Sequence, residues 1–117
     1  MKHILTFCIA ILAAPAFADT PKIEQVHANR SDDGWRFSVT LSHTDEGWDH
    51  YADAWQVEDA NGKVLGLRDL AHPNQDEQPL TRSLSGVQIR DGVNEVFVRA
   101  RCNVDGLSNQ TFAVTLR

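Results

Sequence analysis

The chain has few of the residues that would make its chemistry obvious. Its 117 residues include two cysteines, one methionine and one tyrosine. Lys and Arg number 11 against 16 Asp and Glu, which argues against nucleic acid or an anionic membrane as a partner. Ser-centred elbows, phosphate-binding glycine loops and His-Glu-x-x-His motifs are all missing. We therefore expect that the chain is not an enzyme.

The sequence also lacks an apolar run long enough to cross a bilayer, which takes about 20 residues. The run from Ile4 to Leu12 is much shorter. It follows the positive Lys2 and precedes Ala16-Phe17-Ala18, a small-x-small cleavage signal. We therefore predict a signal peptide at 1–18 and a mature domain at 19–117 that is periplasmic or secreted.

Removal of that signal peptide changes the charge and the cysteine count. The formal net charge of −5 becomes one unit more negative, because Lys2 is lost. Cys8 is lost as well, and lipidation is not expected because Cys8 lies inside the apolar run rather than after it. Cys102 then has no intramolecular partner in an oxidising compartment, so it must be buried, metal-bound or intermolecular.

The mature part alternates apolar and polar residues, which is the period of a strand buried on one face. Asn61-Gly62 predicts a tight hairpin turn, and a shift of the apolar phase at Ser85-Gly86 predicts a bulge. The expected strands are Lys22–Arg30, Trp35–Leu41, Trp55–Glu58, Val64–Leu70, Leu80–Ile89, Val96–Cys102 and Phe112–Leu116. Seven short strands predict an all-β fold, a single antiparallel seven-stranded immunoglobulin-like sandwich.

Local motifs support that fold class. The segment 96–108 resembles the F strand and F–G turn of fibronectin type III domains, and Trp55 on the third strand is similar to the immunoglobulin arrangement. The segment 47–53, together with His72-Pro73 and residues 77–79, resembles small uncharacterised secreted proteins of proteobacteria. These resemblances imply an immunoglobulin-like sandwich and supply no activity.

In an antiparallel sandwich the connections alternate between the two ends. One end receives short turns, whereas the other receives the longer loops 44–53, 71–80 and 103–109, where function is expected. These loops hold seven carboxylates and no Lys or Arg. A bound divalent cation or a basic partner would relieve the repulsion among the carboxylates. An acidic surface screened by salt explains the same composition equally well. Two aromatic residues, Trp48 and Tyr51, lie within the acidic loop. They form either an exposed recognition patch or a cover over the end of the sandwich. For Trp48 we favour burial. The candidate partner-binding residues are Asp45, Glu46, Trp48, Tyr51, Asp76 and Glu77.

Metal-ligating residue types gather at the same end. Imidazole and thiolate ligands suit zinc or copper where they converge. His43 and Cys102, taken singly, are in phase with the buried faces of their strands, which makes them core residues. The candidate metal ligands are His43, Asp49, His50 and His72.

Two functions remain open from the sequence. The first is a non-enzymatic periplasmic binding or interaction module that presents an acidic, aromatic loop end to an unknown protein or small ligand, with a basic partner favoured by the charge. The second is a periplasmic metal-binding protein that uses His and carboxylate ligands at that end. No cofactor is expected except the divalent metal ion of the second interpretation.

Overall fold

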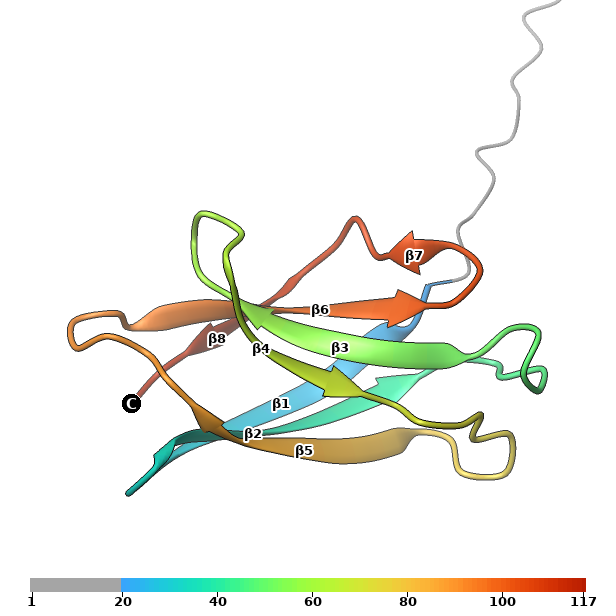
Figure 1. The fold of residues 1–117 in the computed structure, drawn as a ribbon, viewed down its shortest axis with the longest axis horizontal. Helices are drawn as coiled ribbons and strands as arrows, with labels where there is room; N and C mark the ends of the chain where they lie inside the picture. Colours follow the sequence, from blue (N-terminus) through green and yellow to red (C-terminus); the bar gives the residue numbers. More distant parts are fainter. Residues whose placement is uncertain (1–19) are drawn as a thin grey trace, which may run out of the picture.

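The structure is a computed structural model that describes residues 20–117, and these residues fold into two stacked antiparallel sheets (Figure 1). The first sheet has the order β1-β2-β5, and the second has the order β4-β3-β6-β7, with β8 also paired to β6. The strands are β1 (Lys22–Ser31), β2 (Gly34–Ser42), β3 (Ala52–Glu58), β4 (Val64–Asp69), β5 (Leu80–Val87), β6 (Glu95–Cys102), β7 (Gly106–Leu107) and β8 (Phe112–Thr115). The all-β, antiparallel prediction is confirmed. The predicted signal peptide at 1–18 lies outside the described residues.

The strand count of the prediction is wrong, because the described part of the chain holds eight strands rather than seven. The additional strand, β7, has two residues and pairs with Arg101 and Cys102 at the end of β6. Gly106 adopts a φ of 75°, which a side chain rarely tolerates and which lets the chain turn back directly after β6. A two-residue strand has no alternation to detect, so the sequence indicated only a loop there.

Other local predictions are confirmed. β3 and β4 form the expected hairpin across Asn61-Gly62. In the pairing of β2 with β5, Trp35 lies opposite Val87 and Phe37 lies opposite Leu84, so that one extra residue occupies the Ser85-Gly86 segment as a bulge. Both features depend on a glycine with positive φ, 82° at Gly62 and 73° at Gly86, which other residues rarely adopt.

The alternating apolar residues of both sheets meet in one core. Phe37 and Val39 from β2 are fully buried, as are Val57 from β3 and Val96 from β6, and Trp55 is 1% exposed. Trp55 is therefore a core residue, as predicted. The same inward phase continues to the ends of β2 and β6, where it delivers His43 and Cys102 to the interior. Among residues 20–117, no helix is long and apolar enough to span a membrane.

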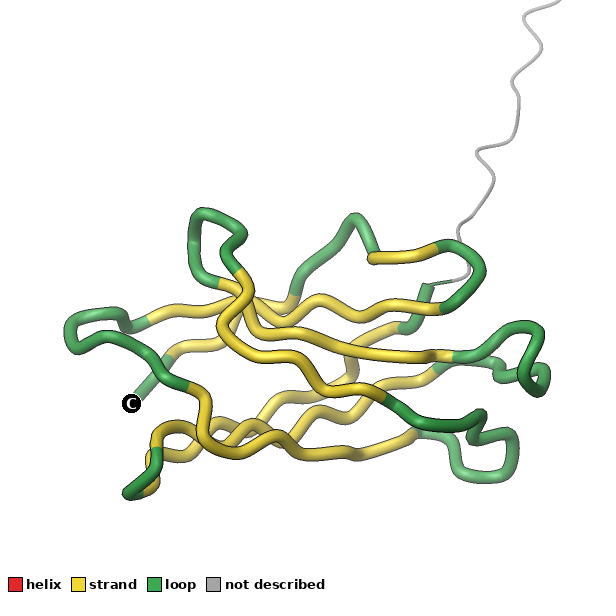
Figure 2. The backbone as a smooth tube through the Cα atoms, in the orientation of Figure 1, coloured by secondary structure: helices red, strands yellow, loops and turns green. Residues whose placement is uncertain are grey.

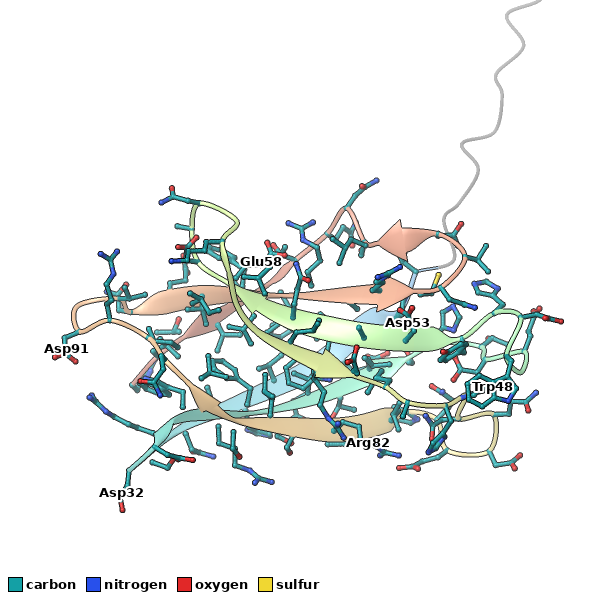
Figure 3. The ribbon with its side chains drawn as sticks, in the orientation of Figure 1. Asp32, Trp48, Asp53, Glu58, Arg82 and Asp91 are labelled. Atoms are coloured by element: carbon teal, nitrogen blue, oxygen red, sulfur yellow. The ribbon has the colours of Figure 1, made fainter. Side chains whose placement is uncertain are left out.

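Glu58, at the end of β3 (Figure 3), forms an ion pair with Arg99 of the neighbouring strand β6. Arg99 donates to both carboxylate oxygens of Glu58, with Nε–Oε2 and Nη2–Oε1 distances of 2.8 and 3.2 Å. Arg99 also donates to the Ser108 carbonyl, and Gln56 donates to Glu58. The hydrogen bond from Arg99 holds the pKa of the buried Glu58 carboxyl below its ordinary value of 4.5.

This pair predicts a loss of stability in acid. Since the pKa of Glu58 is lowered in the folded state, its contribution is present above the unfolded pKa and lost as the pH falls through the folded pKa. Replacing Arg99 by methionine should lower the free energy of unfolding at pH 7 by about 3 kcal/mol, because a buried carboxylate loses its partner. Urea unfolding at pH 3 and pH 7 measures both effects. The difference between Arg99→Met and the parent chain should shrink at pH 3, and an equal difference at both pH values would contradict this role of Glu58.

The loops divide between the two ends of the sandwich as the sequence predicted. Figure 2 shows the connections after β2, β4 and β6 together at one end, opposite the β3–β4 turn. Two hydrogen bonds join the first two of these loops, from the Asn74 N–H to Asp45 and from the His43 N–H to Gln78. Residues from three distant segments therefore meet at this end.

Candidate metal centre

Two histidines and a cysteine converge at the loop end. One ligand atom from each of His43, His50 and Cys102 lies within 4.8 Å of the others. The two imidazole rings are edge-on, with centroids 4.8 Å apart and an interplanar angle of 73°. The three side chains come from the residue after β2, the loop before β3 and the last residue of β6. Nitrogen and sulfur donors are thus gathered around one point.

A tight turn carries His50 back toward His43. Gly47 has a φ of 80°, which favours glycine. The Glu46 N–H donates to the His50 carbonyl at 2.7 Å, and the His50 N–H donates to the Gly47 carbonyl at 3.3 Å. These bonds close residues 46–50 into a compact loop whose last residue reaches the cluster.

Asp45 fixes the orientation of His43. The side chains of both residues are fully buried, and Nδ1 of His43 lies 2.7 Å from Oδ1 of Asp45. A carboxylate accepts hydrogen bonds, so Nδ1–H donates and Nε2 is the nitrogen that can serve as a ligand. Asp45 also accepts from the Ala52 N–H at 3.0 Å and from the Asn74 N–H at 2.8 Å. Such carboxylate–histidine pairs orient ligands in metal sites.

Cys102 is a buried thiol with polar neighbours. Its side chain is 0% exposed, and it is the free cysteine of the described residues. The Asp105 N–H donates to Sγ at 3.2 Å, and the thiol lies 3.6 Å from Oδ2 of Asp105. Burial raises the pKa of the Cys102 thiol, against the opposing effect of backbone hydrogen bonds from Asp105 and Val104. An ion that binds here must be able to displace a thiol proton.

Asp105 completes one side of the cluster. Its Oδ2 lies 3.8 Å from Nε2 of His50, in addition to its contact with the thiol. The side chains of His50 and Asp105 are 17% and 29% exposed, whereas those of His43 and Asp45 are 0% exposed. The cluster therefore faces solvent along its His50 and Asp105 edge.

Asn103 ties the loop of His50 to the strand of Cys102. Its side-chain oxygen accepts from the Tyr51 N–H at 2.9 Å, and its amide donates to the carbonyls of Trp48 and Asp49 at 3.1 and 3.3 Å. Its backbone N–H donates to the Tyr51 carbonyl at 3.2 Å. Asn103 directly follows Cys102, so this clasp sets the separation of two of the three donors.

The cluster fits a single transition-metal ion. Zinc–nitrogen and zinc–sulfur bonds of about 2.0–2.3 Å place neighbouring donors about 3.5 Å apart. The donors of His43, His50 and Cys102 already lie within 4.8 Å of one another, so small side-chain adjustments suffice. The arrangement can hold an ion through two imidazoles and one thiolate, with the Asp105 carboxylate within reach.

The other residues proposed as ligands from the sequence lie outside this cluster. His72 is exposed, and its Nδ1 lies 3.0 Å from the carbonyl of the next residue, Pro73. Asp49 is exposed, and its carbonyl oxygen accepts from Asn103. The sequence correctly placed these residues at the same end of the sandwich as His43 and His50. Residues at one end do not all direct their side chains to the same point.

The predicted acidic, aromatic surface is divided. Asp45 is buried behind His43, whereas Glu46, Asp76 and Glu77 are exposed. Trp48 is 66% exposed at the tip of its loop (Figure 3), so the expectation that it is buried is wrong. Tyr51 is half-buried and packs edge-on against Trp48, with centroids 5.6 Å apart.

Arginines from the strands relieve part of the negative charge. Arg82 on β5 pairs with Glu77 at 3.1 Å and holds the pKa of that carboxyl below its ordinary value. Arg101 on β6 lies 3.6 Å from Asp53. The charge census of the loops alone missed both pairs, because each arginine belongs to a neighbouring strand.

The candidate ligand set from the sequence omitted Cys102 and Asp105. The alternation of inward and outward residues along β6 correctly predicted that Cys102 is buried. The same alternation is expected whether a buried cysteine only packs in the core or also binds a metal. The informative signal was positional, since Cys102 ends its strand at the end where His43 and His50 also lie. Asp105 joins the cluster through the turn that leads into the two-residue strand β7, which had no sequence signal.

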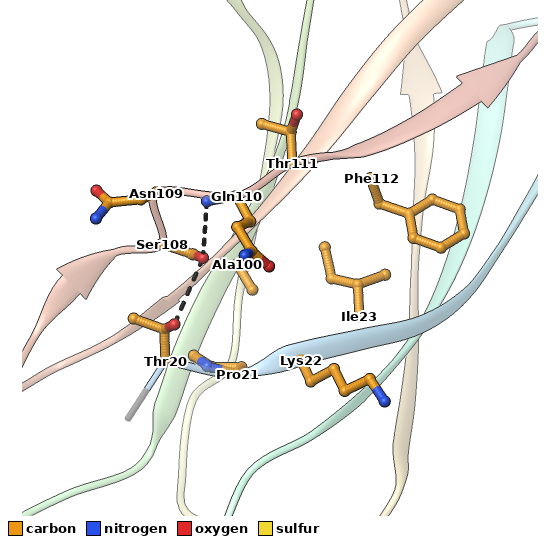
Figure 4. Close-up of a pocket in the computed structure, with 10 residues that line it drawn as sticks. All are labelled: Thr20, Pro21, Lys22, Ile23, Ala100, Ser108, Asn109, Gln110, Thr111 and Phe112. Atoms are coloured by element: carbon orange, nitrogen blue, oxygen red, sulfur yellow. Dashed lines mark hydrogen bonds between the residues drawn. The ribbon is translucent and has the colours of Figure 1, made fainter. Parts of the chain in front are cut away.

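A separate cavity of about 510 Å³ lies between the start of β1 and the segment that joins β7 to β8 (Figure 4). Ile23, Ala100 and Phe112 contribute apolar surface, and Thr20 and Ser108 contribute hydroxyl groups. Its lining contains no residue of the metal cluster. The cavity is therefore distinct from the candidate centre.

Comparison with known proteins gives one relative in sequence. No family model matches the chain. A protein of Halomicrobium mukohataei described as "Putative lipoprotein" is 42% identical over 78 residues, which is 67% of this chain and 38% of that protein. The chain thus spans well under half the length of this curated relative.

Two solved structures of superoxide reductase (neelaredoxin) from Ignicoccus hospitalis, both of single-residue variants, resemble the chain distantly. The first has a TM-score of 0.46 at 18% identity, and the match covers 84% of this chain and 80% of the reductase. The second has a TM-score of 0.44 at 19% identity, and the match covers 85% of this chain and 81% of the reductase. Neither is described as an immunoglobulin or fibronectin type III domain, and the finer family assignment of this chain stays a prediction.

The expectation that the chain is not an enzyme must be corrected. It rested on the missing sequence motifs alone, and the two distantly similar structures are described as superoxide reductases. A cluster assembled from two histidines of one connection and a cysteine of a distant strand leaves no recognised motif in the sequence. The absence of motifs therefore gave no information about this kind of site.

Proposed function

We propose that the chain is an exported metal-binding protein that holds one thiophilic transition-metal ion between His43, His50 and Cys102. The observation that carries this proposal is the convergence of three nitrogen and sulfur donors within 4.8 Å. The Asp105 carboxylate is the fourth donor, on the exposed side of the ion. The proposed ligand set differs from the set predicted from the sequence, because Cys102 and Asp105 replace His72 and Asp49.

The surroundings of the donors support binding rather than mere packing. Asp45 uses hydrogen bonds from two backbone amides and from His43, an arrangement that fixes a ligand and keeps its Nε2 in one direction. Asn103 uses its whole side-chain amide to hold the loop of His50 against the end of β6. Both polar groups serve the geometry of the cluster.

An envelope or secreted location accompanies this function. The predicted signal peptide directs export, and the description of the Halomicrobium mukohataei relative as a lipoprotein supports such a location for this chain.

Metal stoichiometry tests the proposal. Exported protein purified without a histidine tag should contain one ion per chain by elemental analysis, and the metal-free protein should take up one equivalent of Zn²⁺. Replacing His50 by glutamine should weaken Zn²⁺ binding by about tenfold or more, because one ligand is lost. Competition with a chromophoric chelator measures the affinity.

His72→Gln is the matched control, since His72 belongs to the same end of the sandwich and lies outside the cluster. It should bind Zn²⁺ as the parent chain does. Equal weakening by His50→Gln and His72→Gln would contradict the proposed ligand set, and the absence of stoichiometric Zn²⁺ binding would contradict the proposed function.

A further inference from the structure

We infer that the ion of this centre is copper and that it cycles between Cu(I) and Cu(II), so that the chain takes up and passes on single electrons. The inference rests on the proposed metal centre and adds the identity and the chemistry of the ion. Four features carry it: the donor set, the rigidity of the frame, the surroundings of the sulfur and the exposure of the cluster.

The donor set distinguishes copper from zinc. Common protein zinc sites use two or more cysteines, or histidines and carboxylates without cysteine. The cluster has a single cysteine with His43 and His50, and Asp105 stands beside it as a fourth, oxygen donor. Two imidazoles, one thiolate and a weak fourth ligand are typical of copper sites that transfer electrons. Copper(II) also has the highest affinity among the divalent first-row ions for a given nitrogen and sulfur site.

The frame is suited to an ion that changes its charge. Cu(I) and Cu(II) prefer different geometries, so a site that holds its donors in place needs little rearrangement when an electron moves. His43 is fixed by Asp45, and the His50 loop is fixed by the three side-chain hydrogen bonds of Asn103. The imidazole of His43 and its supporting carboxylate are both fully buried.

The surroundings of the Cys102 sulfur are of the kind that adjusts the reduction potential of a copper ion. The Asp105 N–H donates to Sγ of Cys102 at 3.2 Å, and the thiol is fully buried. Hydrogen bonds to the cysteine sulfur and the surrounding apolar packing are two of the protein's means of setting a copper potential.

Electrons reach the ion along one edge. The His50 side chain is 17% exposed, whereas that of His43 is 0% exposed. A one-electron carrier, a reduced protein or small molecule, therefore approaches His50. The carrier loses one electron and Cu(II) becomes Cu(I), with no bond broken in the protein and no proton transferred.

Copper titration of the exported, metal-free protein tests this inference. One equivalent of Cu(II) should give an intense visible band from thiolate-to-copper charge transfer. Ascorbate should bleach the band and ferricyanide should restore it through repeated cycles, with the Cys102 thiol still present by counting after unfolding. Cys102→Ser should reduce the visible absorptivity at least tenfold, whereas His72→Gln should retain it.

The outcomes separate this inference from the proposed function. Stoichiometric Zn²⁺ binding without a visible copper band would overturn the copper inference and leave the metal centre standing. A band that bleaches once, with loss of the thiol, would overturn the cycling. If neither Zn²⁺ nor copper binds, both the inference and the proposed function fail.

Discussion

Replacing Cys102 by serine is expected to weaken Zn²⁺ binding by at least about 100-fold, a larger loss than for any residue that only supports the ligands. The substitution keeps the shape of the side chain and removes the thiolate, the softest donor of the cluster. The fully buried position accommodates serine without a change in volume that the core would resist. Chelator competition on the parent and variant chains gives the ratio of affinities.

The free energy of unfolding without metal serves as the control for this variant. It should change by no more than about 1–3 kcal/mol, the cost of burying a hydroxyl in place of a thiol. An unchanged affinity in a folded Cys102→Ser chain would mean that Cys102 only packs in the core. Bound Zn²⁺ should also slow labelling of the parent thiol in the native state, and labelling should become fast after unfolding.

Replacing Asp45 by asparagine is expected to weaken metal binding by about 10- to 100-fold although Asp45 is not a ligand. The carboxylate accepts from His43 and from the backbone amides of Ala52 and Asn74. Asparagine has one acceptor oxygen, and its NH₂ group must face one of these donors. The cost of an unsatisfied buried donor is about 1–3 kcal/mol in the free energy of unfolding as well.

Asp49→Asn is the matched control for this position, because Asp49 is an exposed carboxylate in the same loop. It should change neither the affinity nor the stability appreciably. If Asp45→Asn lowers only the stability and leaves the affinity intact, Asp45 supports the loop and not the orientation of His43.

The sequence predicted the strands well because a half-buried strand has a strict period of two. Trp35 to Leu41 alternate in the sequence, and the same inward residues are buried in β2. The hairpin at Asn61-Gly62 and the bulge at Ser85-Gly86 were also predictable, since both depend on glycine at a defined place. The alternation of connections between the two ends then placed the long loops correctly.

The candidate centre was predictable only in part. Antiparallel topology gave the shared end of His43 and His50, but their separation depends on the turn at Gly47 and on the clasp of Asn103. No repeating pattern in the sequence reveals the direction of a loop side chain or a hydrogen bond between distant segments. His72 illustrates the limit, since it belongs to the same end and still lies outside the cluster.

The clasp of Asn103 also bears on the kinetics of the ion. Since β2, β3 and β6 supply the buried frame, we expect the surface loop of residues 46–50 to open more easily than the sandwich unfolds. Loading and release of the ion then require a local opening, whose barrier is the rupture of the hydrogen bonds of one amide side chain. If the proposed centre binds metal, we expect the residence time of the ion to depend more on Asn103 and the Gly47 turn than on the thermal stability of the whole domain.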